Sequence, residues 1–357
     1  MRQIGLNDEG NRLSRLSEIG DPLEKVATAV DFELFRPILD EIYSYQTYDD
    51  GKGGRRPWDR VLMFKILLLQ EWNNIADDHT EYLINDRLSY QRFLGLGLGD
   101  KVPDSKTIWL FRETLTKSGR MKELFKLFTT LMEGRGVITR RGSIIDASFA
   151  DAPKQRNTRD ENEKIKRGET PDGWAEQKSE AMLRQKDTDA RWTKKSGISH
   201  FGYKDHIKAD RDSKMIVEYT VTDASVHDSQ CVSELIDSRD RCVHMDGAYV
   251  GETVETAIRE KNRSVRLSIQ EKGYRNRPLT NRQKASNRRR SKIRCRVEHV
   301  FGYMRMSMGG LSVRCVGVGR AASIIGLKNL AYNMMRLVTI EKRKHIITPI
   351  QGVIMSI

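Results

Sequence analysis

The chain has 357 residues, of which 38% are hydrophobic and 31% are charged, and its formal net charge is +14. This length allows a sizeable buried core and suggests about two domains, and the composition is that of a globular protein. The longest apolar run, residues 61–69, contains Lys65 and is far shorter than the roughly 20 residues that a membrane-spanning helix needs. The amino terminus has no apolar stretch of signal-peptide length, so we expect a cytoplasmic protein.

The amino-terminal part of the chain divides into a polar segment and a helical region. Residues 1–54 are polar and weakly patterned and end in the turn-rich DDGKGG. From residue 55 to about 140 the apolar spacing is helical, and Pro57 suits the first turn of a helix. Shorter helical patterns follow at about 78–88, 90–94 and 105–115. Several short helices joined by tight turns are typical of a DNA-binding module, although a structural bundle has nearly the same pattern.

Around Ser143 the pattern changes to short strands that alternate with helices. Strands are predicted at 143–149, 203–210, 215–222, 241–245 and 265–269, and helices at 229–236, 252–261 and around residue 298. This order predicts an α/β fold with a mixed sheet and helices on its faces, over residues 141–310. Residues 311–357 form a carboxy-terminal helical segment.

A polar insertion interrupts this unit at about residues 154–195. It is almost free of apolar residues between 154 and 173, so we expect a mobile or solvated loop. Trp174 and Trp192 are its exceptions. Either they stack on nucleic acid or they anchor the insertion to the sheet, and the second use is the commoner one.

Three acidic residues combine into a pattern with chemical meaning. Asp146 directly follows the apolar Ile144 and Ile145, and Asp246 follows the strand 243–245. Glu298 lies in a basic, helical segment. Two aspartates at strand ends and one helix glutamate are what a pair of hard divalent cations needs beside a phosphodiester. The pattern indicates metal-dependent nucleic-acid chemistry, with other aspartates as rivals: Asp151, Asp223 and Asp228.

The residues around Glu298 share one side of a predicted helix. At about 100° per residue, Ser291, Arg294 and Arg305 all fall within about 60° of Glu298. The ordinary alternative is a surface ion pair between Arg294 and Glu298, which would contribute only about 0.3–0.5 kcal/mol.

A concentrated basic stripe precedes Glu298. Residues 272–296 contain 11 Lys and Arg and no Asp or Glu. Such a stripe is the electrostatic footprint of a polyanion partner, because each neutralised phosphate releases counterions. A solvated loop is the alternative. The basic residues that we assign to DNA binding are Arg288, Arg289, Arg290, Lys292, Arg294 and Arg305.

These motifs resemble the DDE transposases of bacterial insertion sequences, in the group whose glutamate lies in a Tyr-x2-Arg-x3-Glu-x6-Lys signature. The resemblance rests on DRLSYQRFLGLGLGDKVPDSKTIWLFRETL, IIDASFADAP, DARWTKKSGISHFGYKDHIKAD, TDASVHDS, MDGAYVGE and RCRVEHVFGYM. It makes Asp146, Asp246 and Glu298 the catalytic, metal-binding residues and Arg294 the signature arginine. Ser291 stands at the signature tyrosine position and Arg305 at the lysine position. Trp192 and Tyr303 are the aromatics available to replace that tyrosine.

The resemblance implies an RNase H-like core that binds two Mg²⁺ or Mn²⁺ ions. It also implies a transposase that binds terminal inverted repeats, hydrolyses DNA strands and joins 3′ ends to target DNA. Its partner is then double-stranded DNA and not a membrane, and we expect a homodimer on paired ends that is associated with the nucleoid when bound. The residues considered for supporting or phosphate-contact roles are Lys204, His206, His227 and Asp228.

Two other functions stay open on these residues. The first is an endonuclease of the same fold without strand transfer. The second is a transposase-derived DNA-binding protein without chemistry, against which the three carboxylates argue.

Overall fold

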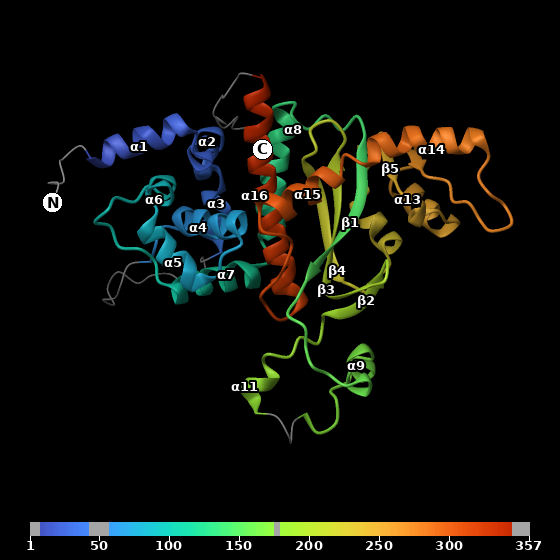
Figure 1. The fold of residues 1–357 in the computed structure, drawn as a ribbon, viewed down its shortest axis with the longest axis horizontal. Coiled ribbons are helices and arrows are strands. Elements are labelled where there is room, and N and C mark those ends of the chain that lie inside the picture. Colours follow the sequence, from blue (N-terminus) through green and yellow to red (C-terminus); the bar gives the residue numbers. More distant parts are fainter. Residues whose placement is uncertain (1–7, 43–56, 175–178, 345–357) are drawn as a thin grey trace. The chain divides into compact units, whose positions relative to one another are not determined.

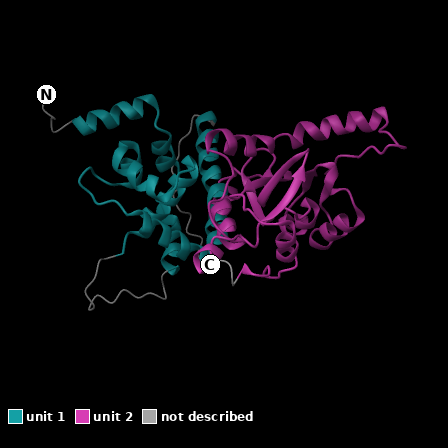
Figure 2. Cartoon of the chain, turned by 60° about the horizontal axis from the view of Figure 1, so that its bottom comes forward, with its two compact units in different colours: residues 1–127, 327–357 teal, residues 128–326 magenta. Residues whose placement is uncertain are grey.

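The computed structural model describes residues 8–42, 57–174 and 179–344 (Figure 1). The chain forms two compact units, one of residues 1–127 with 327–357 and one of residues 128–326 (Figure 2). Within the described residues, no helix combines the length and the apolar composition that crossing a bilayer requires.

The first unit is helical. Its elements are α1 (Asp8–Ile19), α2 (Pro22–Ala29), the 3-10 helix η1 (Phe32–Phe35), α3 (Arg36–Glu41), α4 (Arg60–Asn73), α5 (Asp77–Asp86), α6 (Leu88–Leu94) and α7 (Ser105–Ser118). Two more helices cross the boundary between the units: α8 (Met121–Gly134) and α16 (Val318–Lys344). Residues 8–42, expected to be only weakly patterned, form helices because apolar side chains at close intervals, such as Leu23, Val26 and Phe35, are buried.

Local capping sets where these helices begin. The α4 helix starts at Arg60 and not at Pro57, because the Asp59 side chain accepts a hydrogen bond from Leu62 N at 2.8 Å. Asp104 caps α7 in the same way through Thr107 N at 2.7 Å. The long α4 is buried on most sides, and its Trp72 Nε1 donates to Ala331 O of α16 at 2.8 Å.

The second unit contains a six-stranded mixed sheet. Its strands are β1 (Ser143–Asp151), β2 (Arg191–Lys195), β3 (Ile198–Asp210), β4 (Ile216–Asp223), β5 (Cys242–Met245) and β6 (Arg266–Ile269). The order is β2-β3-β1-β5-β6, and β4 also pairs with β3. Strand β1 is antiparallel to β3 and parallel to β5, and β5 is parallel to β6. The predicted α/β class with a mixed, helix-flanked sheet is confirmed.

Helices cover both faces of this sheet. One face packs against α12 (Val232–Leu235), η3 (Gly247–Tyr249) and α13 (Glu252–Lys261), in a cluster that includes Ile145 of β1. The other face includes Ala150 of β1 and packs against Val313 and the first turns of α16. The remaining helices are η2 (Asp228–Cys231), α14 (Asn281–Arg294) and α15 (Glu298–Ser307).

Two expectations are wrong: one concerns the place of Asp146 in strand β1, and the other concerns the polar insertion. Strand β1 continues beyond Asp146 to Asp151, because its backbone pairs with β3 along the whole length. Asp146 therefore lies inside the strand and not at its end. The partner of Asp151 is Gly202, where an added Cβ would lie 2.4 Å from Ala150 O, so only glycine allows this close approach.

The polar insertion has structure of its own. A capping box of Thr158 and Glu161 starts α9 (Arg159–Lys166), α11 spans Glu180–Leu183, and β2 belongs to the sheet. Trp174 is buried, and its Nε1 donates to Glu161 at 2.5 Å. Figure 1 shows α9 and α11 away from the sheet, so Trp174 orders the insertion internally.

Candidate active site

Strands β1 and β5 bring the two aspartates side by side. The parallel register pairs Ser143 with Val243 and Ile144 with His244, and continuing it by two residues sets Asp246 beside Asp146. Neighbouring strands lie about 4.8 Å apart, so the carboxylates of Asp146 and Asp246 lie next to each other on the sheet. Asp246 caps η3 by accepting from Ala248 N at 2.7 Å, which fixes the direction of its side chain.

Arg294 joins the third carboxylate to this pair. Its Nη1 donates to Asp146 Oδ2 and its Nη2 to Glu298 Oε1, both at 3.0 Å. Arg294 ends α14 and Glu298 begins α15, and the chain between them makes hydrogen bonds three residues apart rather than four. The break lets one guanidinium reach both the strand and the next helix. The predicted Arg294–Glu298 ion pair is present, as one half of a three-residue bridge.

The electrostatics of Asp146 differ from those of an exposed carboxylate. Its side chain is only 18% exposed, and burial raises its pKa, with the negative charge of Asp246 acting in the same direction. The hydrogen bond from Ala147 N and the positive charge of Arg294 lower the pKa. The net effect is a raised pKa for Asp146, with burial as its main cause, and Glu298, 61% exposed, shares the Arg294 guanidinium.

The donor set suits a hard divalent cation. All three side chains offer carboxylate oxygens, which Mg²⁺ and Mn²⁺ prefer. In the described part of the chain, no three His, Cys, Asp or Glu side chains lie close enough to hold one ion together. The physical reason at this site is the Arg294 guanidinium, which stands between Asp146 and Glu298. The three residues have the chemistry of metal ligands. Arg294 has to move before Glu298 can bind a metal ion together with the two aspartates.

Two of the four supporting candidates, Lys204 and His206, lie on the other face of the sheet. His206 pairs with Ala147 and Lys204 with Phe149, so their side chains lie on the sheet face opposite that of Asp146, which pairs with Ile207. Lys204 Nζ donates to Val226 O at 2.7 Å and to Asp228 at 2.9 Å. His206 contacts Thr222, and the His227 side chain accepts from Ser229 N at the start of η2. These contacts stabilise the loop 224–231.

Most of the basic stripe is the helix α14, residues 281–294, and residues 272–280 form the loop that precedes this helix. Helix α14 has no buried residue, and Figure 1 shows it beside β5. The exposed cations of the predicted DNA-binding set are Arg288, Arg289, Lys292 and Arg305. Arg290 instead donates to Ile269 O at 2.6 Å and to Glu271 at 3.3 Å, and so attaches α14 to β6. Ser291 accepts from Gln270 Nε2 at 2.5 Å, which makes it a second attachment point.

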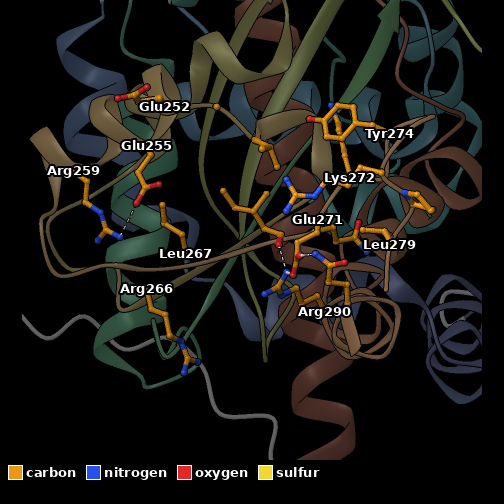
Figure 3. Close-up of a pocket in the computed structure, with 17 residues that line it drawn as sticks. Glu252, Glu255, Arg259, Arg266, Leu267, Glu271, Lys272, Tyr274, Leu279 and Arg290 are labelled. Carbon is orange, nitrogen blue, oxygen red and sulfur yellow. Dashed lines mark hydrogen bonds and ion pairs between the residues drawn. The ribbon is translucent and has the colours of Figure 1, made fainter. Parts of the chain in front are cut away.

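The loop between β6 and α14 belongs to the basic stripe, but its aromatic residue was not assigned any role from the sequence. It borders a cavity of about 860 Å³, which is also lined by α13 and β6 (Figure 3). Tyr274, 64% exposed, stands at its rim among the cations Lys272 and Arg277. The signal that marks it in the sequence is an aromatic residue inside the basic run KGYRNR.

Comparisons with known proteins give two family matches for this chain. Residues 138–334 match the family described as "Transposase DDE domain", and residues 11–114 match the one described as "Transposase domain (DUF772)". The chain is also similar to a solved structure described as a piggyBac transposase synaptic complex with hairpin DNA, at 11% identity and a TM-score of 0.47. That similarity covers 93% of this chain and 77% of the other.

Proposed function

Because this chain belongs to the DDE transposase family of insertion sequences and is thus a DNA transposase, we propose that it binds the terminal inverted repeats of its own element. It then cuts the strands by hydrolysis and joins the free 3′ ends to target DNA. The observation that supports this best is that Arg294 bridges Asp146 and Glu298, while Asp246 lies beside Asp146 on the neighbouring strand.

The three carboxylates would hold two Mg²⁺ or Mn²⁺ ions. When bound, these ions activate a water or a 3′-hydroxyl as nucleophile and stabilise the leaving oxygen. The protein's own contribution is orientation: the backbone amides of Ala147 and Ala248 fix the two aspartates through hydrogen bonds of 2.9 and 2.7 Å. Arg294 neutralises Asp146 before DNA arrives and is placed to bind the scissile phosphate once it leaves the carboxylates.

DNA binding is divided between the two units in this proposal. The helical region 55–140 recognises the terminal repeat, and the catalytic region 141–310 contacts the phosphates through the exposed face of α14. The polar segment 1–54 and the helical segment 311–357 flank them. Two copies of the chain hold paired ends, and in the cell the protein is nucleoid-associated while bound.

The test is incubation of the full chain with Mg²⁺ and labelled DNA that carries the element's ends. We expect nicked strands and products joined to target DNA. Asp146→Asn, Asp246→Asn and Glu298→Gln keep the side-chain shape and remove the charge, so each should abolish cleavage while terminal-repeat affinity stays within about twofold.

Each outcome has a definite meaning. Cleavage by one of these variants at more than a few per cent of the parent rate removes that residue from the site. Nicked strands without joined products would reduce the function to an endonuclease, and binding without any cleavage would leave only a DNA-binding protein.

A further inference from the structure

We propose that the DNA strand at the point of cleavage crosses helix α15 at Gly302, where the missing side chain leaves room for the sugar–phosphate backbone between Glu298 and Arg305. This inference rests on the proposed function. It gives a residue without any reactive group the task of setting how closely the strand approaches the carboxylate site.

Helix α15 has a buried side and an opposite side. Val300 and Met304 are its buried residues. At about 100° per residue, Glu298, Gly302 and Arg305 fall within about 60° of one another, roughly opposite the buried pair. The three residues therefore form one line along the helix, with Gly302 between a carboxylate and a cation.

Packing within the protein does not explain this glycine. A Cβ added to Gly302 would meet no atom within 4 Å, and the backbone there is not in the left-handed region. By contrast, a Cβ at Gly247 would lie 2.9 Å from Lys272 Cγ, so packing accounts for that glycine. Glycine also destabilises the interior of a helix relative to alanine. A position that costs stability and meets no neighbour suits the close approach of a ligand to the backbone.

The residues on either side of Gly302 both suit DNA chemistry. Glu298 Oε1 accepts from Arg294, which also donates to Asp146, so Gly302 lies one helical turn from the carboxylate site. Arg305 is exposed and makes no hydrogen bond or ion pair with the residues that the structure describes. Seven residues of helix separate Glu298 from Arg305, a rise of about 10 Å. A strand that reaches a metal ion at Glu298 and places a phosphate on Arg305 has to pass over Gly302.

The absent side chain makes a notch in the surface of the helix. Cα atoms lie about 2.3 Å from a helix axis, whereas side chains extend the radius to about 5–6 Å. At Gly302 a strand can therefore come closer to the helix by a few ångströms than at a residue with a side chain. Because catalysis is lost with displacements of about 1 Å, the size of the side chain at this position should control the rate of cleavage.

The first experiment measures proximity without catalysis. Gly302→Cys, in the full-length chain and without divalent metal, is incubated with a terminal-repeat end that carries a short thiol tether on the phosphates next to the cleavage point. We expect a disulfide cross-link well above the level of the parent, which measures the background from the native cysteines. Ser307→Cys is the matched control, because Ser307 is exposed on a different side of α15. It should cross-link no more than the parent.

The second experiment measures cleavage with Mg²⁺. Gly302→Leu should cleave at least about tenfold more slowly than the parent, and Gly302→Ala should lie between the two. Affinity for the terminal repeat should stay within about twofold, because other contacts supply it. Both variants should unfold at a urea concentration equal to or above that of the parent, since Ala and Leu favour a helix more than Gly does. Ser307→Leu adds the same bulk elsewhere on α15 and should cleave at the parent rate.

The inference is overturned if Gly302→Cys cross-links no better than Ser307→Cys, or if Gly302→Leu cleaves at the parent rate. It also fails if the Gly302 variants are less stable than the parent, because the position would then be needed for packing. A Gly302→Cys cross-link that forms equally with terminal-repeat and scrambled ends, or with a parent that does not cleave, would sustain the strand path and contradict the proposed function.

Discussion

Arg294 donates one hydrogen bond to Asp146 and another to Glu298, so a single guanidinium neutralises two of the three carboxylates. Planar arginine suits this task because its donors diverge in a rigid fork. The Arg294 guanidinium offsets the repulsion between Asp146 and Glu298. Divalent cations would compete with Arg294 for these carboxylates, and a DNA phosphate would compete for the guanidinium. Arg294 thereby couples metal binding to DNA binding in our proposal.

The first prediction concerns Arg294→Ala. Removing the guanidinium leaves Asp146 and Glu298 without their shared cation, so Mn²⁺ should bind about tenfold more tightly in calorimetric titrations, a change of about 1.4 kcal/mol. Lys292→Ala is the matched control, because it removes one exposed positive charge from the same helix. Equal gains in affinity in both variants would mean that only net charge matters and that Arg294 has no particular place.

The second prediction concerns His206, on the opposite face of the sheet. Burial is the main cause that lowers its pKa to about 4, with the Lys204 charge acting likewise and Asp228 and Glu234 opposing. Nε2 lies 2.9 Å from Thr222 Oγ1, whose proton goes to Asp223 O, and Nδ1 has no hydrogen-bond partner within the described residues. Protonation would bury an unsatisfied N–H, so the neutral ring is the folded form.

The unfolded chain takes up this proton near pH 6.5, and the folded chain only near pH 4, so stability falls as pH decreases between these values. Between pH 7 and 5 this should cost about 2 kcal/mol in the free energy of unfolding from urea titrations. Over the same pH range, the free energy of unfolding of His206→Gln should decrease by about 2 kcal/mol less than that of the parent. His79→Gln, at an exposed site, should keep the parent's pH dependence, and identical pH profiles for all three proteins would refute this account.

Among the elements, α14 is a helix without a buried side, attached to the sheet by Arg290 and the Ser291 hydroxyl. The helix begins with a capping box of Thr280 and Gln283. Packing against the sheet does not explain the exposed cations of the helix. A strongly basic helix with half of its residues exposed and none buried is suited to a polyanion.

The third prediction follows from this helix. Replacing Arg288, Arg289 and Lys292 together by Ala should reduce the slope of log affinity against log salt by about 3, since each phosphate contact contributes roughly 0.9. The matched control replaces three exposed cations of the insertion, Lys154, Arg159 and Arg184, and should leave the slope unchanged. A parent-like slope in the α14 variant would show that this face is only solvated.

On the scale of the whole molecule, the first unit is discontinuous in sequence. Residues 327–357 belong to it, and the α16 residues Leu330, Met334 and Leu337 are fully buried. The Trp72 hydrogen bond to Ala331 and the Lys328–Glu71 pair at 3.7 Å are further links within the unit. A fragment that ends near residue 140 would therefore expose the apolar side of α4.

The fourth prediction tests whether the two units open separately. Leu330→Ala should destabilise the first unit by about 2–5 kcal/mol, so that hydrogen exchange becomes faster at α4 amides than at β1 amides. The matched control is Leu235→Ala, a residue that is also buried but lies in the second unit. In this variant, hydrogen exchange should become faster at β1 amides than at α4 amides. Equal acceleration of both regions by either variant would mean one cooperative unit.

Local sequence signals were sufficient for individual elements. The helix at 252–261 was predicted with the bounds that the structure shows, and the strand that ends just before Asp246 was predicted to within one residue. Both are set by short-range patterns: apolar spacing and a following Asp-Gly turn. The mixed sheet follows from the order of these elements.

Only the tertiary structure decided how the site is assembled. Asp146 and Asp246 are neighbours because β1 and β5, about a hundred residues apart in sequence, pair in parallel with one register. Contacts between distant segments decide which basic residue attaches α14 to the sheet and which one reaches the carboxylates. They also decide where Tyr274 lies. Sequence periodicity identifies which residues face one side of an element, but register and shared partners are set by packing between elements.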